Sequence, residues 1–147
     1  MKSNEIDSGY ERLEAQISWY DEKSGAAQKA YKLTKYFTIG ASALIPVIAV
    51  SAFPYSEFTV AILGALIAIF EGANHVNQWQ HHWITYRSTC EALRHEKYAF
   101  IEAVEPYDIS DEIERRKHLV GRVESLISTE HSKWIAVQDE AGKKVKT

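Results

Sequence analysis

YFTIGASALIPVIAVSAFPYS, residues 36–56, contains no Asp, Glu, Lys or Arg, and FTVAILGALIAIF, residues 58–70, repeats that character. At a rise of ~1.5 Å per helical residue, the first stretch is long enough for a bilayer core of ~30 Å. The link at 54–57 leaves room only for a tight reversal, so a second span must return across the same bilayer. The sequence therefore predicts a transmembrane helical hairpin with spans at 36–56 and 55–76.

The composition sets bounds on the remaining classes of protein. The mean hydropathy of −0.29 suits a soluble protein, and a buried soluble helix is the alternative for the first stretch, but the average hides apolar residues concentrated between the two charged flanks. The net charge is −3, which argues against nucleic acid as a partner. The single cysteine, Cys90, excludes an intrachain disulfide and a cysteine-based zinc cage. The opening MKSNEIDSGY is polar, so we expect no signal peptide.

Basic residues predict the orientation of the hairpin. They flank both spans on the same side, whereas the link carries none: Lys23, Lys29, Lys32, Lys35, Arg87 and Arg94. Positive residues mark the cytoplasmic side of a membrane protein. We therefore expect a multi-pass protein of the plasma membrane, with both termini in the cytoplasm and the lipid bilayer as its first partner.

Outside the spans, apolar residues recur at alternating spacings of three and four, which is typical of helices that pack along one seam. The pattern predicts a helix over 8–34, a continuation of the second-span helix over 77–105, ended by Pro106, and a C-terminal helix over 110–138. Their lengths and short links predict an all-α, single-domain chain in which the hairpin continues into an antiparallel three-helix cytoplasmic coiled-coil bundle. The seams are interpreted as core, with a partner-binding face as the alternative. The seam positions are Tyr10, Leu13, Ile17, Tyr20, Ser24, Ala27, Tyr31 and Thr34; Trp79, Trp83, Tyr86, Cys90, Leu93, Lys97, Phe100 and Val104; and Ile113, Arg116, Val120, Val123, Ile127, Glu130, Trp134 and Val137.

Two features of the spans bear on their packing. Pro46 predicts a kink near the middle of the first span. Gly64, Ala68 and Gly72 recur every four residues in the second, where small side chains allow close approach of helices, although such residues are also common in membrane helices generally.

A polar stripe follows the second span and is the candidate functional site. Its members lie within about 100° of one helical face at 3.6 residues per turn: Glu71, Asn74, His75, Gln78, His82 and Thr85. Ionisable groups at the membrane boundary face a bundle interior or a wet cavity, so the stripe is a candidate lining for an ion pathway. The alternatives are a structural Glu71–Lys35 ion pair and a metal held by Glu71 and His75, but no HExxH spacing or cysteine pair supports a metal.

A second polar set predicts a structural network within the cytoplasmic bundle. Its members are Arg87, Glu91, Arg94, Glu96, Glu130, Trp83 and Trp134, with Lys35 at the membrane. Opposite charges one helical turn apart favour a buried network over anion binding by Arg87 and Arg94. No Gly-rich phosphate loop or nucleophile elbow occurs, so we expect no enzyme and no cofactor.

Several stretches resemble one family: ERLEAQISWYDEKS (11–24), ALIPVIAV (43–50), LGALIAIFEG (63–72), HWITYRSTCEALRHEKY (82–98) and STEHSKW (128–134). The sequence resembles the SLATT family of two-transmembrane proteins, named for association with SMODS and SLOG domains, in its branch defined as a domain of unknown function. The strongest signature comprises Trp83, Tyr86, Arg87, Glu91, Leu93, Glu96 and Lys97, followed by Glu130 and Trp134.

The resemblance implies a bacterial membrane effector of nucleotide-linked conflict systems that forms homo-oligomers and opens pores or disrupts the membrane. Because this sequence includes no recognisable sensor domain, it also implies that nucleotide sensing falls to a separate cytoplasmic protein. The other function that the residues allow is a membrane-anchored scaffold, in which the hairpin anchors and the bundle docks a partner. The polar stripe favours a pore, whereas the lack of charges deeper in the second span favours a scaffold.

Overall fold

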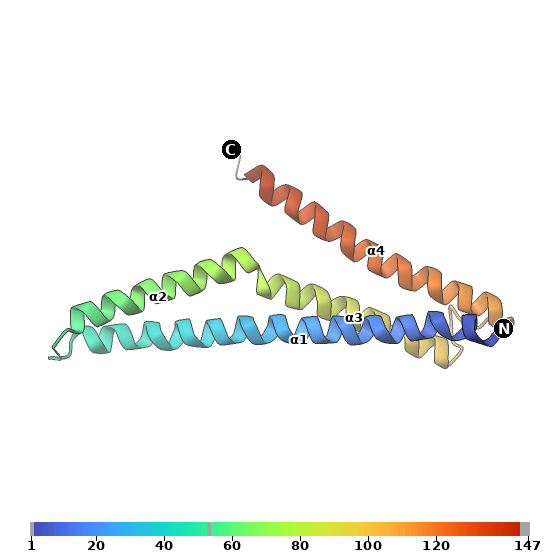
Figure 1. Ribbon diagram of the computed structural model, residues 1–147, viewed down its shortest axis with the longest axis horizontal. Helices are drawn as coiled ribbons and strands as arrows, with labels where there is room; N and C mark the ends of the chain where they lie inside the picture. Colours follow the sequence, from blue (N-terminus) through green and yellow to red (C-terminus); the bar gives the residue numbers. More distant parts are fainter. Residues whose placement is uncertain (1, 53, 145–147) are drawn as a thin grey trace. The chain divides into compact units, whose positions relative to one another are not determined.

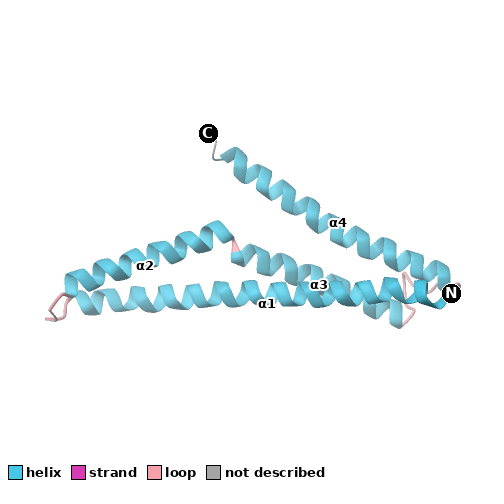
Figure 2. Ribbon diagram, in the orientation of Figure 1, coloured by secondary structure: helices cyan, strands magenta, loops and turns pink. Residues whose placement is uncertain are grey.

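A computed structural model describes the backbone of residues 2–52 and 54–144, and the side chains of residues 9–52, 54–130 and 132. These described residues form four α-helices, shown in Figures 1 and 2. They are α1 (Lys2–Ala49), α2 (Ser56–Asn77), α3 (Trp79–Ile101) and α4 (Glu112–Lys144). The described residues include no β-strand. The all-helical class predicted from the sequence is confirmed.

Helix α1 joins the first predicted soluble helix to the first predicted span. It passes through Gly25 and Pro46 without interruption. It ends at Ala49, so residues 50–52, 54 and 55 of the predicted span 36–56 lie outside the helix. Beyond that end, the Ser51 hydroxyl and amide both donate to the carbonyl of Ile48 and close a final turn. Pro54, which lacks an amide hydrogen, belongs to the turn that leads into α2.

The prediction of one continuous helix from the second span to residue 105 is wrong at Gln78. This residue adopts a left-handed backbone (φ 47°, ψ 39°) between α2 and α3, and its amide donates to the Asn74 carbonyl at 2.9 Å. Regular helical hydrogen bonding resumes where the His82 amide donates to the Gln78 carbonyl. A left-handed residue that ends a helix is usually Gly or Asn. A glutamine there gives no local warning, which is why the seam spacing missed the break.

Helix α3 also ends before the predicted residue 105. Its last residue is Ile101, and Ala103 follows with φ 50°. The amides of Glu102 and Val104 still bond back to carbonyls of the last turn of α3. The chain therefore leaves the helix through a left-handed residue before it reaches Pro106.

The chain divides into two compact units. Unit 1 comprises Met1–Glu22 and Thr85–Thr147, and unit 2 comprises Lys23–Ile84. Unit 1 therefore combines the first part of α1 with most of α3 and all of α4. Unit 2 pairs the rest of α1 with α2 and the start of α3.

Unit 1 has a conventional apolar core. Side chains from α1, α3, α4 and the loop before α4 are buried together: Leu13, Ile17, Tyr20, Cys90, Leu93, Ala99, Tyr107, Leu119 and Val123. The first seam is confirmed as a packing surface, since all its positions from Tyr10 to Thr34 are buried or half-buried. The second seam is confirmed except at Val104, which is exposed because it lies beyond the end of α3.

Helix α4 begins later and runs further than the predicted 110–138. The Asp111 carboxylate accepts the Ile113 amide at 3.0 Å, which satisfies one of the open amides of the first turn. The predicted seam of α4 is wrong in its first half, because Ile113 and Val120 are exposed and Leu119 is buried instead. Val120 lies at the edge of the core against Gly9, where an added Cβ would meet its methyl group at 3.1 Å. The seam positions Trp134 and Val137 lie outside the described side chains.

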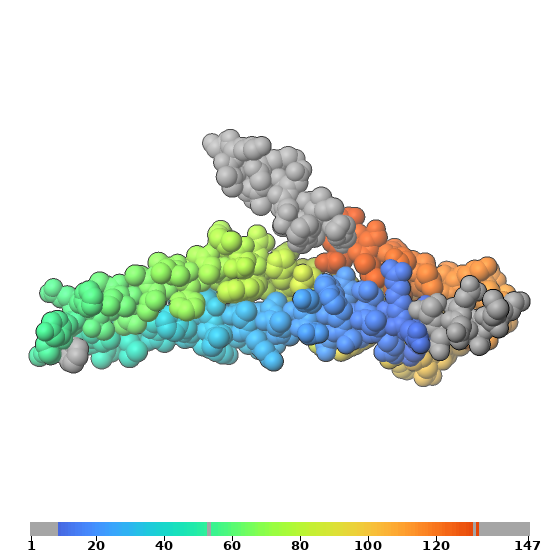
Figure 3. All heavy atoms as spheres, in the orientation of Figure 1, coloured from blue at the N-terminus to red at the C-terminus, as the bar shows by residue number. Residues whose placement is uncertain are grey.

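Unit 2 is an antiparallel pair of helices with almost no core. The ring centroids of Phe37 and Phe70 are 4.6 Å apart, and Figure 3 shows α2 beside the second part of α1. Among the described residues of this unit, the buried side chains are small: Ser24, Thr34 and Ala41. Helix α2 has no buried residue at all. Its apolar side chains therefore cover the outside of the pair.

Candidate functional site

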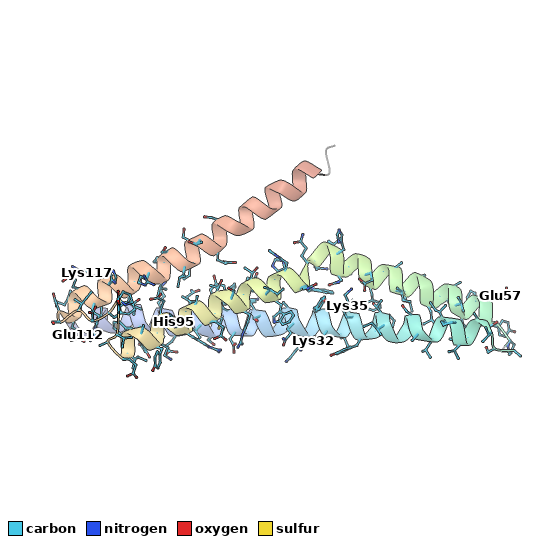
Figure 4. All side chains as sticks on the ribbon, turned by 180° about the vertical axis from the view of Figure 1, so that it is seen from behind. Lys32, Lys35, Glu57, His95, Glu112 and Lys117 are labelled. Atoms are coloured by element: carbon cyan, nitrogen blue, oxygen red, sulfur yellow. The ribbon has the colours of Figure 1, made fainter. Side chains whose placement is uncertain are left out.

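The centre of the candidate site is an ion pair between the two helices of unit 2. The Lys35 ammonium lies 3.0 Å from each carboxylate oxygen of Glu71. The Asn74 amide, one turn further along α2, also hydrogen-bonds to this carboxylate. Figure 4 shows Lys35 on the side of α1 that faces α2, and Lys32 on the opposite side. Both members of the pair are about one-third exposed (36% each).

This geometry matches the structural alternative predicted for Glu71. A carboxylate with a lysine on both oxygens and an amide donor has its charge compensated within a single chain. A charged group at the edge of an apolar segment is costly unless it is paired or reaches water. The lysine stem is long enough to bring its ammonium to that edge. The pair therefore explains how a glutamate is tolerated at the end of the apolar stretch of α2.

The rest of the polar stripe does not continue along one helical face. The break at Gln78 changes the direction in which later side chains project. Three stripe members, Asn74, His75 and Gln78, instead line an open cleft of about 430 Å³ together with Gln80, His81 and Ile84. His82 is outside this lining and is half-buried, with its ring 6.2 Å from that of His81. Thr85 belongs to unit 1 and is therefore not part of this cleft.

Three residues of the cleft were missed from the sequence: Gln80, His81 and Ile84. His81 is seven residues after Asn74 and lies at the edge of the stripe on a continuous helical wheel, so its spacing could have indicated it. Gln80 and Ile84 lie away from the stripe on that wheel, and the left-handed turn at Gln78 separates them from it in the sequence. A glutamine followed by a tryptophan is not a recognisable helix stop, so these two residues had no signal in the sequence.

The predicted arginine–glutamate network exists in unit 1, but it is exposed rather than buried. Glu91 accepts from Arg87 at 2.5 Å and from Arg94 at 3.2 Å. Asp21 of α1, which was not predicted, bonds the same two arginines at 3.3 and 3.2 Å. Side-chain exposures of 40–51% place this cluster at the surface, where ion pairs contribute about 1 kcal/mol or less. With two carboxylates already on the arginines, the cluster has little capacity for another anion.

The buried charge of unit 1 is Glu96. Its carboxylate accepts two hydrogen bonds from Arg122 of α4, at 2.8 and 2.5 Å, and one from the hydroxyl of Tyr107. The Arg122 guanidinium holds the pKa of Glu96 below its usual value. Burial raises the pKa of Tyr107, which keeps that hydroxyl a donor. This network joins α3, the loop and α4.

The remaining predicted network residues have separate partners. Glu130 accepts from the buried hydroxyl of Tyr20 at 3.1 Å, so it links α4 to α1. In unit 2, Trp83 stacks on Tyr31 with ring centroids 6.3 Å apart. Trp134 lies outside the described side chains. An additional ion pair, Lys97 with Glu14, was not predicted and lowers the pKa of Glu14.

Metal and thiol chemistry have little support in the described residues. They contain no cluster of three or more His, Cys, Asp or Glu side chains that could hold a metal ion. Cys90 is fully buried, and its thiol donates to the Ile17 carbonyl at 3.6 Å. Burial raises the pKa of this thiol, which disfavours the reactive thiolate. Cys90 is a small core residue, as expected from its place in the seam.

The surface of unit 2 is apolar where a soluble protein would be polar. Within Ser56–Ile101, an 18-residue window has a mean hydropathy of 1.6 and none of it is buried. Among the described residues this is the one helical stretch that is long and apolar enough to cross a membrane. The first predicted span fails that test because α1 ends at Ala49. The fold and surface thus define an all-helical protein with one candidate membrane-spanning helix.

Comparison with known proteins places the chain in a family. It belongs to the family described as "Protein of unknown function (DUF4231)", whose model matches residues 15–115. The match covers unit 2, the adjoining parts of α1 and α3, and only the first residues of α4. No curated protein and no solved structure matches the chain.

Proposed function

We propose that the chain is a two-span membrane protein, with the helical pair of unit 2 in the bilayer and unit 1 in the cytoplasm. The observation that carries this proposal is the exposed apolar surface of unit 2. In α2 alone, Phe58 is 67% and Ile69 is 65% exposed, and on α1 Val47 is 62% exposed. In water such a surface would aggregate or bind another protein, whereas in lipid it is solvated.

Helix lengths are compatible with two crossings. Helix α2 spans ~33 Å at ~1.5 Å per residue, enough for a core of ~30 Å. The helical part of the first uncharged stretch, 36–49, covers only about two-thirds of that thickness at the same rise. The missing length is supplied by the turn before α2 and by residues preceding Tyr36, where Lys35 is compensated by Glu71.

The lysines of α1 and the arginines of α3 support an orientation with both termini in the cytoplasm. Lys29 and Lys32 are exposed directly before the apolar segment, and Arg87 and Arg94 follow α2. The turn between α1 and α2 has no basic residue. The resemblance to bacterial two-transmembrane effectors supports a location in the bacterial inner membrane.

Within the bilayer, we propose that the protein is a homo-oligomeric pore or channel-like effector of a bacterial conflict system. One antiparallel helix pair cannot enclose a pathway, so a pore needs several copies. Helix α2 has room for another helix, because a Cβ added at Gly64 or Gly72 would meet nothing within 4 Å. The resemblance to two-transmembrane effectors supplies the functional class, and a cytoplasmic sensor protein would supply the trigger.

The second candidate function is a membrane-anchored scaffold, in which unit 1 docks a partner and no solute crosses. The Lys35–Glu71 ion pair favours it, because the charge of the Glu71 carboxylate is then compensated within the chain and is not free to line a pathway. Unit 1 also has an apolar core of its own, as a partner-binding domain requires.

Ion flux through liposomes separates the two functions. The variants are Glu71→Gln and Lys35→Gln, with Glu57→Gln at the opposite end of α2 as a matched control. A pore conducts in the wild type, loses cation flux in Glu71→Gln and retains it in Glu57→Gln. A scaffold gives no protein-dependent flux in any of them. Cross-linked oligomers in detergent are expected for the pore, and a stable monomer would contradict it.

A further inference from the structure

The cleft at the break between α2 and α3 is lined almost entirely by polar side chains that carry no acid. Five of its six side chains are polar, and all five can donate hydrogen bonds: Asn74, His75, Gln78, Gln80 and His81. The sixth is Ile84. None of the six is acidic. An open volume of about 430 Å³ is large enough for a phosphate group with its substituents.

The chemistry of this lining suits an anion. Amide and imidazole N–H groups are good donors to phosphate oxygens. Of the five polar lining residues, Asn74 also bonds to the Glu71 carboxylate, which leaves His75, Gln78, Gln80 and His81 as the main donors to an anion. The backbone at the break adds to this preference, because the first amides of α3 have no carbonyl one turn earlier in that helix. A headgroup with a cationic amine would find no acidic partner among the lining residues.

The position of the cleft indicates the source of the phosphate. Asn74 and His75 follow Glu71 by about one helical turn, or ~5 Å along α2. The Lys35–Glu71 pair marks the end of the apolar stretch, so the cleft lies at headgroup level if α2 crosses the bilayer. Val76, which follows His75 on the same turn of α2, is an exposed apolar side chain that acyl chains could contact.

We propose that this cleft binds the phosphate group of an anionic phospholipid of the phosphatidylglycerol type. The lining lacks Lys and Arg, so a free phosphate ion would be held weakly. A lipid whose acyl chains already lie along α2 is present at a high effective concentration and needs few additional contacts. The lipid would then occupy the break and fix α2 against the start of α3 at the membrane surface.

The test is lipid retention by the full-length protein in detergent, measured by native mass spectrometry. Equal concentrations of phosphatidylglycerol and phosphatidylcholine are offered to the wild type and to the double variant His75→Ala/His81→Ala. The matched control is His95→Ala/His118→Ala, which removes two exposed histidines from unit 1. We expect the wild type and the control to retain phosphatidylglycerol preferentially, and the cleft variant to bind it about tenfold more weakly.

Equal retention by the cleft variant and the wild type would overturn the proposal. Retention of both lipids alike would also contradict it, because an acid-free cleft should discriminate against choline. If inorganic phosphate displaces the lipid at similar concentration, the ligand is a soluble phosphate and the assignment to a lipid is wrong. The inference rests on the proposed membrane location, which is tested separately by the accessibility of the α1–α2 turn to a labelling reagent. We expect the histidine variants to leave that accessibility unchanged. Loss of lipid binding and failure to insert therefore give different results.

Discussion

Units 1 and 2 use the same secondary structure and distribute their apolar side chains in opposite ways. In unit 1, residues such as Leu13 and Leu93 are fully buried, and charged pairs cover the surface. In unit 2, the buried positions are small, and large apolar side chains face outward. Regular helical spacing of apolar residues therefore does not show whether a helix lies in water or in lipid. Large apolar side chains that face the core are typical of helices in water, whereas large apolar side chains that face outward are typical of helices in lipid.

The largest expected difference between the units comes from removing a leucine. Leu93→Ala in unit 1 leaves a cavity in a closed core, which should cost about 3 kcal/mol of unfolding free energy. Leu44→Ala in unit 2 removes a side chain that is 53% exposed, and lipid can fill the space, so the cost should stay below about 1 kcal/mol. Hydrogen exchange of the backbone amides of α3 and α1, followed in detergent, measures the loss of stability in each variant. Equal losses in the two variants would contradict the difference between the units.

Ion pairs within unit 1 provide the next comparison. Arg122→Met leaves the buried carboxylate of Glu96 with Tyr107 as its remaining donor, and should cost about 3 kcal/mol. Arg12→Met breaks a pair with Glu124 that is exposed on both sides, and should cost about 1 kcal/mol or less. Chemical denaturation followed by circular dichroism compares them. A larger effect at Arg12 would mean that Glu96 is not the buried charge that joins α3 to α4.

Acid should weaken unit 1 through the same carboxylate. The folded pKa of Glu96 is lowered by Arg122, so its stabilising contribution is fully present above the usual value of 4.5 and is lost as the pH falls through the folded value. Glu14, whose pKa Lys97 lowers, acts in the same direction. A series of denaturation curves below pH 5 should therefore show falling stability in the wild type and a flatter dependence in Glu96→Gln. Identical slopes would sink this assignment.

The smallest predicted effect concerns the break between α2 and α3. Gln78→Gly removes the cost of a left-handed non-glycine residue and should raise stability by up to about 1 kcal/mol. Gln80→Gly, two residues later in regular helix, should lower it by a similar amount. Opposite shifts in the thermal midpoint are expected. Shifts of the same sign would indicate that α2 and α3 form one helix in solution.

The sequence predicted those features that depend on regular spacing. The first seam, most of the second and the helical class are confirmed, and the Lys35–Glu71 pair occurs as the structural alternative for Glu71 predicted. Contacts that depend on tertiary position were missed, including Asp21 with Arg87 and Glu96 with Arg122, because these partners lie on different helices. The break at Gln78 was missed because its backbone conformation has no residue-level signal.

The most direct test of the account is the accessibility of single cysteines to a membrane-impermeant maleimide in intact cells. The native Cys90 is fully buried and gives a low background. Cysteine at Ser56, the first residue of α2 next to the turn between the two helices of unit 2, should react from outside. Cysteine at Ser3 or Thr147 should react only after the cells are opened. Labelling of the ends but not of Ser56 in intact cells would reverse the topology. Recovery of the protein in the soluble fraction would contradict the central claim that lipid surrounds unit 2.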